Sequence, residues 1–167
     1  TLKNLLDSNY RGALLVVNPK CDTVQGVKSF RDVENLPAVD CAILAIPAKL
    51  CTAAVETLCN KKSCKAIIIL SAGFSEDSKE GAEIERKIVE TCNATGCSLI
   101  GPNCIGVMTQ NYAGVFTHPI PNLSSKGVTL ISGSGATIVF ILEAAVQLGL
   151  QFNQVFSVGN SAQLGVE

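Results

Sequence analysis

The chain has 167 residues, of which 47% are hydrophobic and 16% charged, with a net charge of −1 and a mean hydropathy of +0.35. This composition excludes a disordered segment, and the lack of a basic block gives nucleic-acid binding no electrostatic support. No apolar run approaches the roughly 20 residues that span a bilayer, and no basic-then-apolar leader begins the chain. We therefore expect a cytoplasmic protein that binds neither membrane nor nucleic acid.

Apolar, β-branched runs alternate with helical stretches along the chain. The predicted helices lie near residues 1–9, 50–61, 79–95 and 135–149. The predicted strands are residues 13–18, 41–46, 66–70, 97–100, 128–132 and 154–158. Continuously apolar strands are typical of parallel strands covered on both faces. The sequence therefore predicts an α/β fold with a doubly wound parallel sheet, and no internal repeat is evident.

The two ends of the chain suggest a fragment. A doubly wound domain normally opens with a strand and a glycine-rich turn, whereas this chain opens with a helix and begins at Thr1 instead of Met. We expect a piece cut at both ends. Prolines and turn formers in residues 117–127 predict a domain boundary, which divides the chain into residues 1–124 and 125–167. His118 lies in this stretch and is interpreted as a linker or capping residue.

Four predicted strands end in loops rich in proline, glycine and polar residues. In parallel sheets, ligands bind beyond the carboxyl ends of the strands, so these loops predict a rim for an extended ligand. The rim would offer a cation for phosphate, small residues for close approach and an amide for hydrogen bonds. The alternative for Cys104 is a buried filler thiol. The loops comprise Asn18, Pro19 and Lys20; Ile46, Pro47 and Ala48; Ser71, Ala72, Gly73 and Phe74; and Gly101, Pro102, Asn103 and Cys104.

A second candidate site follows the strand predicted at 128–132. Consecutive backbone N–H groups at a helix N-terminus bind anions, and serine hydroxyls add donors. The segment lacks the lysine of a P-loop, and its alternative is a tight turn with a serine cap. Its residues are Ser132, Gly133, Ser134, Gly135 and Ala136. Gly159 and Asn160 follow the last strand and would line the same pocket.

Other polar groups indicate no separate chemistry. The carboxylates Glu76, Asp77 and Glu80 precede a predicted helix, whose dipole favours them, and we interpret them as solvated. The eight cysteines include no C-x-x-C pair, and the chain has one histidine, so we expect no metal site. Free cysteine packs as a small hydrophobe, and we predict that these thiols stay reduced in the cytoplasm.

Six segments appear in an order and spacing that resemble one family: VNPK (17–20), ILAIPA (43–48), SAGFSE (71–76), GPNCIG (101–106), ISGSGA (131–136) and SVGNSA (157–162). The chain closely resembles the NDP-forming acyl-CoA synthetases, which are related to the succinyl-CoA synthetase α subunit. The resemblance implies a Rossmann-like CoA-binding domain without its first strand, followed by the start of a flavodoxin-like ligase domain. It implies CoA contacts at Lys20 and at the three later loops of the rim, and a phosphoryl group held by the helix that opens at Ser134.

The same resemblance implies the reaction and its partners. Such enzymes convert an organic acid, CoA and ATP or GTP into acyl-CoA, the nucleoside diphosphate and phosphate, reversibly, through an acyl phosphate and a phosphohistidine. ATP or ADP and Mg²⁺ would bind other domains, notably an ATP-grasp domain or subunit, and we expect an oligomer. The phosphohistidine would lie beyond Glu167, since His118 does not match it, and Gly133 replaces the usual bulky polar residue. The chain alone is therefore expected to bind CoA without turnover.

Two alternatives remain at this point. The same domains occur in protein lysine acetyltransferases with a catalytically silent, synthetase-like body that binds CoA or nucleotide for regulation. An ordinary dinucleotide-dependent dehydrogenase is the other, although no acidic residue follows a G-x-G-x-x-G turn here.

Overall fold

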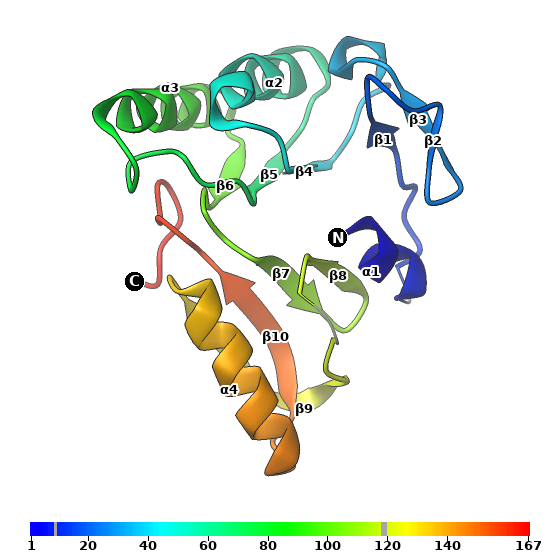
Figure 1. Cartoon of the computed structure of the whole chain (residues 1–167), viewed down its shortest axis with the longest axis vertical. Helices are drawn as coiled ribbons and strands as arrows, with labels where there is room; N and C mark the ends of the chain where they lie inside the picture. The colour runs from blue at the N-terminus through cyan, green and yellow to red at the C-terminus, as the bar shows by residue number, and fades with distance from the viewer. Residues whose placement is uncertain (9, 118–119) are drawn as a thin grey trace.

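The computed structural model describes residues 1–8, 10–117 and 120–167, and its elements form three sheets (Figure 1). The helices are α1 (Leu2–Asp7), the 3₁₀ helix η1 (Val33–Asn35), α2 (Ala48–Lys61), α3 (Lys79–Thr95) and α4 (Gly135–Gln147). The strands are β1 (Val16–Val17), β2 (Thr23–Val24), β3 (Val27–Phe30), β4 (Cys41–Leu44), β5 (Ala66–Ile69), β6 (Ser98–Ile100), β7 (Gly106–Thr109), β8 (Tyr112–Val115), β9 (Leu123–Ser132) and β10 (Phe152–Ser157). His118 lies outside the described residues.

The parallel sheet β4-β5-β6 forms the first layer, and α2 and α3 lie together over one of its faces (Figure 1). Ser78 caps α3 by accepting a hydrogen bond from the Gly81 N–H, and Gly96 ends the same helix in the left-handed conformation. Buried side chains from both helices and from β5 and β6 make the core between them, including Val55, Ile88 and Leu99. This arrangement confirms the predicted Rossmann-like α/β class.

The second sheet has the order β8-β7-β10-β9, and α4 packs beside it (Figure 1). Strands β9 and β10 are parallel and joined by α4, as expected of an opening βαβ unit, whereas the β7–β8 hairpin pairs antiparallel with β10. The sequence analysis missed this hairpin and also the β2–β3 hairpin. The predicted boundary after residue 124 falls inside β9, and the division into 1–124 and 125–167 stays a prediction.

An apolar cluster joins the two larger sheets. Its buried members are Ile68, Cys104 and Val107, and partly buried side chains from β4, β6, β8 and β10 pack against them. The face of β4-β5-β6 opposite the helices therefore packs against β7, β8 and β10. Within the described residues, no helix is both long and apolar enough to cross a membrane.

Helix α1 is fixed to strand β8 by one buried amide. Asn4 is 5% exposed, and its Nδ2 donates to the carbonyl oxygens of Val115 (2.7 Å) and Thr117 (3.0 Å). We expect Asn4→Ala to lower the free energy of unfolding by about 1–3 kcal/mol, because two carbonyls lose their donor in a buried place. Urea denaturation followed by circular dichroism measures the change. Lys3→Ala is the control: its ion pair with Asp7 is exposed, and its loss should cost less than about 0.5 kcal/mol.

Candidate functional site

Three predicted rim loops meet at the carboxyl edge of β4-β5-β6 because these strands run parallel and in register. The Ser71 hydroxyl donates to the carbonyl oxygen of Ile46 (2.6 Å), and the Asn103 N–H donates to the carbonyl oxygen of Ser71 (2.9 Å). Each loop is thus hydrogen-bonded to the next across the edge. The loops comprise residues 46–48, 71–74 and 101–104.

An open hollow of about 350 Å³ lies between the first two loops and the amino end of α3. Small residues line part of it, notably Ala48, Ala72 and Gly73, and Lys49 supplies a positive charge. Helix α2 begins at Ala48, in the lining of this hollow, and no side chain caps its first N–H groups. Asp77 and Glu80 also line the hollow, so an anionic group would be favoured only toward α2. The site suits a narrow ligand with a polar or anionic end.

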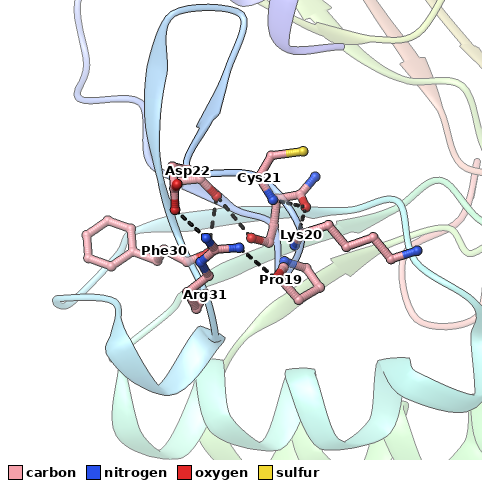
Figure 2. Close-up of polar contacts among 8 residues, drawn as sticks. Pro19, Lys20, Cys21, Asp22, Phe30 and Arg31 are labelled. Atoms are coloured by element: carbon pink, nitrogen blue, oxygen red, sulfur yellow. Dashed lines mark hydrogen bonds and ion pairs between the residues drawn. The ribbon is translucent and has the colours of Figure 1, made fainter.

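The fourth loop lies at the end of β1, which belongs to the small β1-β3-β2 sheet. Asn18 Oδ1 accepts hydrogen bonds from the N–H groups of Lys20 (2.9 Å) and Cys21 (3.2 Å) and so shapes the turn. Arg31, paired with Asp22, donates to the Pro19 carbonyl (2.8 Å), and the Lys20 side chain extends away from this pair (Figure 2). Among the described residues no hydrogen bond links this loop to the other three, which lie on a different sheet.

The structure corrects two positions of the predicted rim. The Phe74 side chain is fully buried in the core under α2 and α3, so only its backbone lies at the rim. Cys104 is 3% exposed, and its thiol donates to the Ile69 carbonyl (3.3 Å). Burial raises the pKa of Cys104 to about 11, so the group is a protonated thiol that does not face a cleft. Asn103 remains exposed beside it, with a positive φ of 57°.

The predicted phosphate turn connects β9 to α4, and its serines cap the helix. Ser132 Oγ accepts from the Ser134 N–H (3.1 Å), and Ser134 Oγ accepts from the Thr137 N–H (3.2 Å). Gly135 and Ala136 are the first two residues of α4, where N–H groups have no acceptor within the helix itself. The turn therefore has the structure of a serine-capped helix start, as its alternative interpretation expected, and it also keeps two N–H donors for an anion.

Asn160 connects the loop after β10 to the rim, a role that was not predicted from the sequence. Its N–H donates to the Pro102 carbonyl (2.9 Å), and its Oδ1 accepts from Asn103 Nδ2 (3.3 Å). Its Nδ2 lies within hydrogen-bond distance of three acceptors, which are the carboxylates of Glu76 and Glu85 (3.0 Å for Glu85) and the Ser75 hydroxyl (3.3 Å). An amide has two N–H bonds, so it satisfies two of these three acceptors at a time. Asn160 thus ties together three loops that lie far apart in the sequence.

Glu76 is part of this network and is not simply solvated. Its Oε1 accepts from the N–H groups of Gly73 (2.6 Å) and Phe74 (3.2 Å), and its Oε2 accepts from Asn160. Burial acts to raise the pKa of Glu76, but the hydrogen bond from Asn160 and those from the Gly73 and Phe74 N–H groups outweigh it and lower the pKa. Asp77 and Glu80 are exposed, as predicted. A carboxylate two residues after Phe74 was the available signal for a loop held by its own side chain.

A parallel sheet with loops gathered at its carboxyl edge, joined to a βαβ unit, defines a Rossmann-like α/β protein, a class that binds ligands at this edge. Residues 1–110 match the family described as the CoA binding domain, and the chain belongs to that family. It corresponds to the CoA-binding region of NDP-forming acyl-CoA synthetases.

Curated relatives match almost the whole chain. Acetate–CoA ligase (ADP-forming) I of Archaeoglobus fulgidus is 38% identical over 98% of this chain and 24% of its own length. The α subunit of acetate–CoA ligase (ADP-forming) II of Pyrococcus furiosus is 35% identical over 92% of this chain and 33% of its own length. The chain thus spans about a quarter to a third of these relatives.

Solved structures agree in fold. The apo form of dinucleotide-forming acetyl-coenzyme A synthetase 1 of Ca. Korarchaeum cryptofilum superposes with a TM-score of 0.88, at 28% identity, over 98% of this chain and 35% of that one. The same protein in complex with phosphate and ADP gives a TM-score of 0.86. PH0766 from Pyrococcus horikoshii OT3 gives 0.84 at 34% identity, over 96% of this chain and 37% of that one.

The Asn160 network predicts a pH-dependent variant. Asn160→Asp places a carboxylate against Glu76 and Glu85, and we expect it to lower the free energy of unfolding at pH 7 by roughly 1 kcal/mol. In the native protein the lowered pKa of Glu76 means that its hydrogen bonds add stability above its ordinary pKa of 4.5, and that this is lost as pH falls through the folded-state value. Lowering the pH should therefore reduce the difference in the free energy of unfolding between the variant and the native protein. Urea denaturation from pH 7 to pH 3 measures it.

Asn153→Asp provides the control, because Asn153 Oδ1 accepts from Gln110 and an aspartate retains that bond. If the loss in free energy of unfolding caused by Asn160→Asp stays constant from pH 7 to pH 3, the proposed repulsion from Glu76 and Glu85 is contradicted.

Proposed function

We propose that this chain is the CoA-binding portion of an enzyme that forms acyl-CoA, ADP and phosphate from an organic acid, CoA and ATP, and that also runs in reverse. The observation that supports it most is that the loop after β10 contacts both parts of the site. Asn160 in this loop is hydrogen-bonded to Asn103 and Glu76 of the rim loops, and the Val158 N–H donates to the Ser132 carbonyl at the start of the phosphate turn (3.0 Å). The names of the relatives, acetate–CoA ligase and 4-hydroxybutyrate–CoA ligase, support the reaction class.

In this proposal the rim binds CoA. CoA would supply the thiol that accepts the acyl group, and the chain's part is to hold and orient it. The hollow beside Ala48 and Gly73 would take a narrow part of the molecule, and α2 with Lys49 would favour its anionic groups. Phe74 and Cys104 would contribute backbone groups alone, given their buried side chains. The remaining proposed contacts are Asn18, Pro19, Lys20, Ile46, Pro47, Ser71, Ala72 and Asn103.

The turn from Ser132 to Ala136 would hold the phosphoryl group. The N–H groups of Gly135 and Ala136, in the first turn of α4, are fixed dipoles, which would stabilise the charge of a phosphoryl group at each stage of transfer with little reorganisation. Gly133 leaves space beside the Gly159 carbonyl: an added Cβ would lie 3.3 Å from that oxygen. The neighbour solved with phosphate and ADP supports a phosphate role for proteins of this fold.

Other parts of the reaction would belong to other segments. We propose that ATP or ADP with Mg²⁺ binds an ATP-grasp domain or subunit, that the phosphohistidine lies outside this chain, and that the assembly is oligomeric and cytoplasmic. Relatives named as α subunits support a divided assembly. The lysine acetyltransferase alternative is not favoured, because the relatives reported above are ligases.

The first test concerns Lys20. In the intact protein, Lys20→Ala should weaken CoA binding by about 1 kcal/mol or more, roughly fivefold in Kd, through loss of a charge-assisted contact to phosphate. Calorimetry at low salt measures the change, and the defect should shrink with a CoA analogue that lacks the contacted phosphate. Lys28→Ala is the control, since Lys28 is an exposed lysine of the same small sheet. Equal affinities of Lys20→Ala and native protein would remove Lys20 from the site.

The second test separates phosphate binding from helix capping at Ser134. Asp and Asn both replace serine well as caps, so Ser134→Asp and Ser134→Asn should leave α4 and the stability intact. The aspartate puts a negative charge beside the turn, and we expect it to weaken phosphate binding and slow phosphoenzyme formation at least about tenfold. The neutral asparagine should change either quantity far less. If Ser134→Asp forms phosphoenzyme at the native rate, the turn does not hold the phosphoryl group.

A further inference from the structure

Two six-residue segments of the chain repeat one pattern, which the sequence analysis missed. Residues 59–64 read CNKKSC and residues 92–97 read CNATGC, so each is C-N-x-x-[S/G]-C. Each segment makes the turn from a helix to the next parallel strand, the first from α2 to β5 and the second from α3 to β6. The residue before the second cysteine has a left-handed φ in both turns, 59° at Ser63 and 65° at Gly96.

The repeated turns bring their cysteines together. The Sγ atoms of Cys59, Cys92 and Cys97 all lie within 4.8 Å of one another. Cys64 belongs to the same turn as Cys59 and leads into β5, whose Ala66 pairs with Ser98 directly after Cys97; the Cys64 thiol donates to the Ala66 carbonyl (3.2 Å). All four are buried, with exposed fractions of 8%, 0%, 0% and 2% for Cys59, Cys64, Cys92 and Cys97. Four thiols thus converge from two equivalent turns.

We propose that Cys59, Cys64, Cys92 and Cys97 form a tetrathiolate site for a soft divalent cation of the Zn²⁺ class. Zn–S bonds of about 2.3 Å in a tetrahedron place sulfurs about 3.8 Å apart, so the three nearest sulfurs need only a small contraction. A C-x₄-C pair lies within the spacings that zinc sites use, and thiolate ligands favour soft ions over Mg²⁺. The site takes one ion per chain.

Zn²⁺ binds thiolates, and burial without a cation disfavours the charged form of a thiol. The carboxyl ends of α2 and α3 carry partial negative charge, which also opposes bare thiolates. On binding, the four thiols release four protons and the Zn²⁺ tetrathiolate carries a charge of −2.

A lysine between the two turns would offset part of this charge. Lys65 follows the first turn, and its Nζ donates to the Thr95 carbonyl of the second (3.3 Å), whereas Lys61 is already paired with Glu34 (2.7 Å). Lys65 therefore joins the two turns directly. A positive charge close to a buried anionic cluster reduces the cost of burying it.

The position of the site indicates a structural role. The four cysteines lie in the turns that lead into the amino ends of β5 and β6, whereas three of the rim loops lie at the carboxyl edge of the same β4-β5-β6 sheet. A bound cation would cross-link the ends of α2 and α3 to the sheet without touching the rim. Because an ion bound only to the folded state stabilises it by mass action, we expect metal to raise the thermal stability and leave the affinity for CoA unchanged.

The test uses the intact, reduced protein after removal of metal with a chelator. Zn²⁺ is titrated against a coloured competing chelator, and Cd²⁺ is titrated while the ultraviolet thiolate-to-metal absorption is recorded. We expect one ion per chain, the cadmium–thiolate band and a higher Tm. Alkylation in mild denaturant, mapped by mass spectrometry, should show metal-dependent protection of Cys59, Cys64, Cys92 and Cys97. Cys51 and Cys104 are buried outside the cluster, and their labelling should not depend on metal.

Variants supply the matched comparison. Cys92→Ala and Cys97→Ala should each lose at least about tenfold in Zn²⁺ affinity, whereas Cys51→Ala, a fully buried cysteine near the start of α2, should keep it. If a variant fails to fold, metal-dependent protection of the four cysteines from alkylation in the native protein still tests the proposal. Absence of a stoichiometric ion, absence of metal-dependent protection of these four cysteines, or equal loss of affinity in Cys51→Ala would overturn the proposal.

Discussion

The backbone hydrogen bonds between the turn at residues 101–103 and the loop after β10 fix where the candidate ligand groups lie. The Asn160 N–H donates to the Pro102 carbonyl and the Ala162 N–H to the Gly101 carbonyl (3.3 Å). Gln163 extends the contact by accepting from the Leu99 N–H of β6 (2.5 Å). Gly159 permits this approach, because its φ is +54° and an added Cβ would lie 2.1 Å from the Pro102 oxygen. The position of the phosphate turn relative to the rim follows from these few bonds.

Local signals were enough to predict the elements that carry the first sheet. Strands β4 and β5 are short, β-branched and apolar, and α3 has both a serine cap at Ser78 and a C-terminal glycine at Gly96. The two hairpins have local two-residue turns at 25–26 and 110–111 and were missed all the same, but the place of β7 in its sheet was not predictable from local signals. Strand β7 has four residues, and its pairing with β10 depends on residues more than 40 positions away. Such pairing is decided by packing of the whole chain, which no local window contains.

The candidate site, too, was predictable from the sequence only in part. The order of its motifs located the rim and the phosphate turn, but a motif does not say whether a residue acts through its side chain or its backbone. Phe74 and Cys104 belong to the rim by sequence, yet their side chains belong to the core. Glu76 looked solvated because its partners include Asn160, 84 residues later. Hydrogen bonds of this range become visible only in the folded chain.

The repeated C-N-x-x-[S/G]-C turns show how a parallel sheet turns a sequence repeat into a spatial cluster. Consecutive crossovers of the same hand place equivalent turns side by side at the amino edge of neighbouring strands, which lie about 4.8 Å apart. Register confirms the proximity: Ala66 pairs with Ser98, and each follows within two residues of a cysteine. The same geometry gathers the rim loops at the opposite edge. One sheet thus separates the groups proposed to bind ligand from the thiols proposed to hold its helices, so either set can change without disturbing the other.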